Sequence, residues 1–114
     1  MPLNDTLLNI GANSMAAAAT HLSLATANPE PSGSNQATSA RVVAGWGAAA
    51  NGDLTISNKA FTGGAANGPC THVCFWSAVS GGTYYGSVAL TGDTTFNSAG
   101  EYTITSLTVN GSST

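Results

Sequence analysis

The pattern of apolar and polar positions begins with a segment of helical character, residues 3–19. Asn4 or Asp5 can cap its N-terminus, because a short polar side chain there accepts a hydrogen bond from the first turn. Gly11 and Asn13 weaken its middle, so one helix and two short helical pieces both fit. The segment either closes one end of a sheet domain or forms an arm that docks on a neighbouring subunit. Its apolar side is carried by Leu3, Leu7, Leu8 and Ile10.

From Thr20 onward the pattern has the period of two that is typical of strands. The segment 21–26 places Leu22 and Leu24 on one face. Turns rich in Gly, Asn and Ser separate further segments dense in β-branched and aromatic residues, and the turn at 80–82 predicts a hairpin. About seven short strands at this spacing predict an all-β fold, a β-sandwich with a short N-terminal helix. The other predicted strands are 40–46, 54–57, 60–62, 71–79, 83–90 and 102–109.

The length of 114 residues is that of one domain. We therefore expect a single domain over 1–114, with the helical segment at 3–19 and the β-sandwich at 20–110. No internal repeat and no second domain are visible in the sequence.

Charged residues are unusually scarce. Only 6% of the chain is Asp, Glu, Lys or Arg, against about 25% in a typical soluble domain. Disorder is not expected, because 42% of the residues are apolar and the net charge is only −3. A surface with so few charges is poorly protected against association. We therefore expect much of it to lie in contacts with neighbouring proteins.

The charge balance also excludes classes of partner. The two cationic side chains, Arg41 and Lys59, are too few for the phosphate contacts of a nucleic-acid-binding protein or for an anionic membrane. The apolar run 15–19 is far shorter than the ~20 residues that span a bilayer. The start lacks the basic region of a signal peptide, so synthesis in a cytoplasm is expected.

One constellation resembles a metal site: Cys70, His72 and Cys74. On a regular strand the two cysteines lie about 13 Å apart, too far to share one Zn²⁺ or to form a disulfide. A turn near Cys70 relaxes that limit, so the site stays open as a minor alternative to buried, unreactive side chains. We expect no cofactor and no metal.

Catalysis is not expected. His21 and His72 could meet as a pair, yet no pattern around any serine indicates a nucleophile with its base. The carboxylates Asp53, Asp93 and Glu101 fall in or beside turns, where capping is their usual role. A small hydrolase is therefore the weakest of the functional hypotheses.

Four aromatic residues are candidate interface residues: Trp46, Trp76, Tyr84 and Tyr85. Phe75 and Trp76 alternate on a strand, as do Tyr84 and Tyr85, so one of each pair should be core and the other exposed or in an interface. Aromatic side chains are enriched at the centres of protein interfaces. A row that stacks on a sugar is the alternative, and protein contacts are favoured.

Placed in order, these segments resemble a family of small tailed-bacteriophage virion proteins, described as tail-fibre-like, head-fibre or capsid decoration proteins. The resemblance implies a β-sandwich virion component without a catalytic motif. It covers nearly the whole chain and is carried by Thr20–Pro29, Arg41–Ala49, Thr71–Ala78, and Thr83–Leu90 with the closing strand.

The leading expectation is a capsid decoration or minor capsid protein that binds the outer shell and stabilises it. Its partners would be the major capsid protein or other virion subunits, and a homo-oligomer is expected, with a trimer as one arrangement. The alternative is a tail-tip or tail-fibre module that binds a host receptor or glycan. The absence of a heptad or fibrous repeat favours the capsid.

Overall fold

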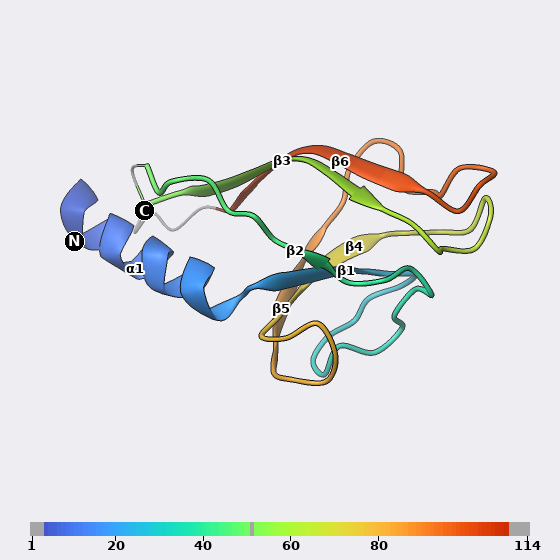
Figure 1. Cartoon of the computed structure of the whole chain (residues 1–114), viewed down its shortest axis with the longest axis horizontal. Helices are drawn as coiled ribbons and strands as arrows, with labels where there is room; N and C mark the ends of the chain where they lie inside the picture. Colours follow the sequence, from blue (N-terminus) through green and yellow to red (C-terminus); the bar gives the residue numbers. More distant parts are fainter. Residues whose placement is uncertain (1–3, 51, 110–114) are drawn as a thin grey trace.

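The computed structural model describes residues 4–50 and 52–109. Within these residues the chain forms one helix and six strands (Figure 1). Leu3 and Asn110, at the edges of the predicted segments, lie outside the described residues. The elements are α1 (Asp5–Ala18), β1 (His21–Ala25), β2 (Val42–Val43), β3 (Leu54–Phe61), β4 (His72–Trp76), β5 (Tyr84–Ala89) and β6 (Tyr102–Val109).

Helix α1 is continuous and lies at one end of the longest axis of the molecule (Figure 1). Asn4 is its N-cap: the side-chain Oδ1 accepts the backbone N–H of Leu7 at 2.9 Å. Ala12 is buried, and the Oδ1 of Asn9 accepts the backbone N–H of Gly52 at 2.8 Å, just before β3. One side of the helix therefore packs on its own domain. Among the described residues, no helix is long and apolar enough to cross a membrane.

The larger sheet has the strand order β2-β1-β4-β5. Strands β1 and β4 are antiparallel, with Leu22 opposite Phe75 and Ser23 opposite Cys74. Because side chains alternate along a strand, this register creates two faces. Leu22, Leu24, Val73 and Phe75 belong to the main core, whereas Ala25, Cys74 and Trp76 form a second, smaller cluster.

Both faces of this sheet are buried at its centre. The loop 28–36 lies over the smaller cluster, where Gln36 donates a hydrogen bond to the Sγ of Cys74 and accepts one from Ser23. Trp76 consequently exposes only 8% of its surface, and Phe75 on the other face only 9%. The expectation that one of these two is exposed is wrong, because the loop covers the face that the strand pattern alone leaves open.

Strands β4 and β5 form the predicted antiparallel hairpin, with a register shift between Phe75 and Trp76. The loop that joins them is held by Arg41, whose Nη1 donates to the carbonyl oxygens of Ala78 and Gly81, each at 2.8 Å. The guanidinium carbon of Arg41 also lies 3.8 Å from the centre of the Trp76 ring. One cation thus fixes both the loop and the ring.

The second sheet consists of β3 and β6, paired antiparallel from Leu54 opposite Val109 to Phe61 opposite Tyr102. The two short strands expected at 54–57 and 60–62 are one strand here. Asn58 has a φ of +51°, a left-handed conformation that asparagine tolerates better than most residues. The strand therefore continues through this turn-favouring residue.

Residues from both sheets share the main core: Ile56 and Ile104 pack in the same cluster as Leu22 and Val73. The protein is therefore mostly β, with one short helix, as the sequence predicts. A seven-strand sandwich is not confirmed. The described residues form six strands, one of them only two residues long, in sheets of four and two.

Candidate interface

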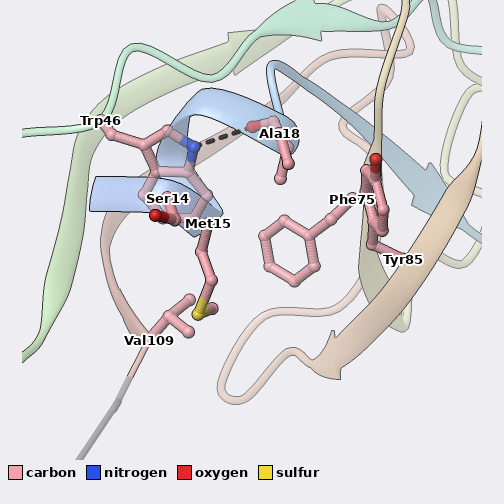
Figure 2. A pocket seen from close by; sticks show the side chains of 8 residues that line it. Ser14, Met15, Ala18, Trp46, Phe75, Tyr85 and Val109 are labelled. Carbon is pink, nitrogen blue, oxygen red and sulfur yellow. Dashed lines mark hydrogen bonds between the residues drawn. The ribbon is translucent and has the colours of Figure 1, made fainter. Parts of the chain in front are cut away.

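An apolar cavity of about 430 Å³ lies where α1 meets both sheets. Its lining comes from the last turns of α1, the segment after β2, the β4–β5 hairpin and the end of β6 (Figure 2). We call it the α1 pocket. The side chains that define it are Met15, Ala18, Trp46, Phe75, Tyr85 and Val109, with Ser14 and Ala19 completing the wall.

Trp46 is held rigidly at this pocket. Its indole N–H donates to the backbone carbonyl of Ala19 at 2.8 Å, and its ring stacks on Phe75 with centroids 5.8 Å apart (Figure 2). The carbonyl it bonds follows the C-terminal end of α1, where helices leave such groups unpaired. An aromatic side chain fixed in this way loses little conformational entropy when another protein packs on it.

Tyr85 and Met15 form the accessible part of the wall. Tyr85 lies on the edge strand β5 and exposes 52% of its surface, and Met15 on α1 exposes 46%. Among the residues that line the pocket none is charged. The Trp46 N–H is already paired, which leaves the Ser14 and Tyr85 hydroxyls as side-chain hydrogen-bonding groups. The chemistry of the pocket therefore suits apolar side chains.

Trp76 and Tyr84 lie elsewhere, in the smaller cluster. The Trp76 indole N–H donates to the Oγ of Ser23 at 2.8 Å, and the two rings lie 5.1 Å apart. The Tyr84 hydroxyl donates to Glu30 at 3.0 Å, and burial raises the pKa of Tyr84 to about 12. The structure thus divides the four candidate interface residues into two pairs, and only Trp46 and Tyr85 share the pocket.

Only Trp46 and Tyr85 of the eight lining residues are candidates from the sequence, and the residues it does not single out include Met15, Ala18, Phe75 and Val109. Met15 and Ala18 lie in the predicted helical segment, but after Ile10, the last residue that marks its apolar side. Phe75 and Val109 come from strands whose spatial relation to the helix no periodicity can show. Only the fold brings these four residues beside Trp46.

The cysteines are free and buried, and they occupy different clusters. Strand β4 begins at His72, so Cys70 precedes it and belongs to the main core, while Cys74 belongs to the smaller cluster. Burial raises the pKa of both thiols, that of Cys70 to about 11 with a further contribution from Asp93. Within the described residues no group of three or more potential ligands could hold a metal ion.

The histidines are not neighbours. The register places His72 opposite Ala25, four residues along β1 from His21, which is about 13 Å of strand. Each ring instead meets the threonine before it: the His72 Nδ1 lies 2.7 Å from the Oγ1 of Thr71, and the His21 Nδ1 lies 2.8 Å from that of Thr20.

The carboxylates Asp93 and Glu101 line a polar groove of about 520 Å³ beside β6. The Oδ1 of Asp93 accepts the backbone N–H of Thr95 at 3.1 Å and its hydroxyl at 2.8 Å. Glu101 accepts a hydrogen bond from the Nδ2 of Asn97 at 3.2 Å. Both carboxylates thus serve to order the loop that precedes β6, which is the capping role the sequence indicates.

In a comparison with protein-family models, the chain matches the family described as Podophage GP4 fiber I protein gp80 over residues 3–112. Neither the curated proteins nor the solved structures that were searched contain a match. The family match spans nearly the whole chain, including α1, both sheets and every residue of the α1 pocket. The chain therefore belongs to the podophage fiber I protein family and is a fibre-like structural component of the phage virion.

Proposed function

We propose that the chain is a non-catalytic subunit of a phage fibre, held to neighbouring virion proteins through the α1 pocket. The observation that carries this proposal is the pocket itself, an uncharged hollow with Trp46 and Tyr85 in its wall. Apolar and aromatic groups of this kind form the buried centres of protein interfaces.

The composition supports a permanent contact. With seven charged side chains in the chain, few ions have to be desolvated when two surfaces close on each other. Many copies that each bind an assembled virion but not its separated parts stabilise the assembly by mass action. Neither effect needs covalent chemistry or a cofactor.

The family description favours a fibre over the capsid decoration that is the leading expectation from the sequence. Decoration remains the second candidate, supported by the lack of a fibrous repeat in the sequence. Receptor or glycan binding at the tail tip finds less support at the α1 pocket, because sugar recognition needs several convergent hydrogen-bonding groups. The pocket wall instead favours contact with protein.

The experiment is the copy number and location of the protein in purified virions, from quantitative mass spectrometry of separated heads, tails and detached fibres. We expect the protein in the fibre fraction, at a copy number matching the other fibre chains. Hundreds of copies in heads without fibres would replace the proposal with decoration. Absence from virions would overturn both.

A matched pair of variants tests the surface. Tyr85→Arg places a charge at the pocket, and Val79→Arg places the same charge on another exposed apolar residue, in the β4–β5 loop. We expect phage that carry Tyr85→Arg to lose the protein from their virions, while Val79→Arg phage keep it. Equal incorporation of the two variants would remove the α1 pocket from the proposal.

A further inference from the structure

The polar groove beside β6 has the hydrogen-bonding groups that the α1 pocket lacks. It is formed where the loop 91–97 meets the paired ends of β3 and β6. The loop before β6 lies toward the end of the molecule away from α1 (Figure 1). The volume of the groove, about 520 Å³, falls within the range of small-molecule sites, roughly 300–1,000 Å³.

Hydrogen-bonding groups without a partner in this chain converge on the groove. Asp93 uses only Oδ1 to order its loop, and Glu101 uses only Oε1. The second oxygen of each carboxylate therefore has its acceptor capacity left. Four threonine hydroxyls of the wall likewise form no hydrogen bond within residues 4–50 and 52–109, those of Thr62, Thr91, Thr103 and Thr105.

The wall of the groove is held in place by bonds of its own. The Oδ1 of Asn97 accepts the backbone N–H groups of Ala99 and Glu101, each at 2.9 Å. The Tyr102 hydroxyl donates to the backbone carbonyl of Asp93 at 2.7 Å, and its ring packs edge-on against Phe96, with centroids 6.4 Å apart. A wall ordered in this way loses little entropy when a ligand binds.

Tyr102 also supplies the groove with apolar surface. Its hydroxyl is engaged by Asp93, and its ring is only half-buried although it lines the groove. The groove thus combines one aromatic ring with carboxylate oxygens and hydroxyls. That combination matches a sugar, whose hydroxyls donate to carboxylates and exchange hydrogen bonds with threonine, while its C–H groups pack on an aromatic ring.

We propose that the polar groove binds a neutral glycan, of the kind that a virion component meets on a bacterial surface. The charge of the wall determines that the glycan is neutral. Asp93 and Glu101 line the groove, and no Lys, Arg or His is among its lining residues, so the acidic groups of an anionic glycan would be repelled.

Two other classes of ligand fit the groove less well. A metal ion needs more ligands than it offers, because the described residues hold no group of three or more His, Cys, Asp or Glu side chains that could bind one. A basic peptide would rely on two exposed carboxylates, and exposed ion pairs contribute little to binding. The groove also lacks an accessible large aliphatic side chain on which a peptide could anchor.

The groove and the α1 pocket can be occupied together. Tyr102 lines the groove at the start of β6, and Val109 lines the α1 pocket at its end. About 23 Å of strand lies between these two residues. A subunit held in the virion through the α1 pocket would therefore keep the groove accessible. The inference goes beyond the proposed function and does not depend on it.

The test is binding of the purified full chain to an array of neutral and acidic bacterial surface polysaccharides. Isothermal titration calorimetry with an oligosaccharide from the neutral polysaccharide that binds best then gives the affinity. We expect binding to neutral members of the array and none to acidic ones. Because no metal takes part, EDTA should leave the affinity unchanged.

Matched variants locate the site. Thr103→Val removes a hydroxyl from the groove, and Thr108→Val removes an exposed hydroxyl from the same strand outside it. Valine keeps the β-branch that strands favour, so both variants should fold, with circular dichroism as the check. Glu101→Gln removes the charge but still accepts the hydrogen bond from Asn97. We expect Thr103→Val and Glu101→Gln each to weaken binding at least ~10-fold and Thr108→Val to bind as the native chain does.

Three results would overturn the proposal. The first is an array on which no neutral polysaccharide binds, or on which acidic ones bind better. The second is equal affinity in Thr103→Val and Thr108→Val, which would place any glycan elsewhere on the chain. The third is loss of binding in EDTA, which would show that a metal ion, rather than the side chains of the groove, holds the sugar.

Discussion

The indole ring of Trp46 stacks on the phenyl ring of Phe75, with an angle of 25° between their planes. Through this stack, and through the hydrogen bond from Trp46 to the carbonyl of Ala19, the segment after β2 connects the end of α1 to the centre of β4. Trp46 therefore helps to place the helix against the sheets, together with the hydrogen bond between Asn9 and Gly52.

Trp46→Phe should lower the free energy of unfolding by about 1–2 kcal/mol, because the Ala19 carbonyl loses its donor and the smaller ring packs less well. Urea denaturation measures the change. Tyr85→Phe, which removes a hydroxyl from the same pocket, should change stability by less than ~0.5 kcal/mol. Equal losses in the two variants would mean that the Trp46–Ala19 bond contributes nothing.

Arg41→Lys should loosen the β4–β5 loop although the charge is kept. A lysine cannot make the planar contact on Trp76 while also donating to Ala78 and Gly81, so a loss of about 1–2 kcal/mol is expected. Hydrogen exchange should show faster exchange at residues 77–83. Lys59→Arg, the converse change on β3, should leave that loop as protected as before.

Gly100→Ala should destabilise the protein strongly. A Cβ there would clash with the backbone oxygen of Gly64, and the φ of +74° is already unfavourable for alanine. Gly92→Ala has nearly the same φ, +77°, but open space around it, so it measures the conformational strain alone, about 1–2 kcal/mol. The thermal unfolding midpoint of Gly100→Ala should be the lower of the two. The reverse order would show that the loop at Gly64 can move aside.

Cys70 should make stability fall in alkaline solution. Its pKa rises from 9.0 to about 11 on folding, chiefly because burial disfavours the thiolate. A raised pKa of an acid means that the neutral thiol stabilises the fold below pH 9, and that this contribution is lost as the pH rises towards 11. The thermal midpoint should therefore fall more steeply over this range in the native chain than in Cys70→Ala. If the thermal midpoints of the native chain and of Cys70→Ala fell in parallel with pH, the contribution of the Cys70 thiol to stability would be contradicted.

In this protein the sequence predicts the local structure of each segment better than it predicts which residues become neighbours in space. The Asn4 cap, the two-residue period of β1 and the Gly-rich turn of the hairpin are local signals, and each element forms where they indicate. The burial of Trp76 is not predictable in this way, because it depends on the loop 28–36, some 40 positions earlier in the chain. The α1 pocket shows it again: Met15, Trp46 and Val109 meet only after both sheets have assembled.

The edges of the four-stranded sheet carry a consequence for solubility. Proteins usually guard exposed strand edges with charge, which this chain largely lacks. Instead, β2 ends one edge after only two residues, and β5 interrupts the other with Gly86, whose φ of 134° accompanies the shift in register against β4. Both devices deny an incoming strand a long, flat row of backbone groups. The four-stranded sheet therefore offers an incoming strand little backbone to pair with, so contacts of assembly at this sheet have to be made by its side chains.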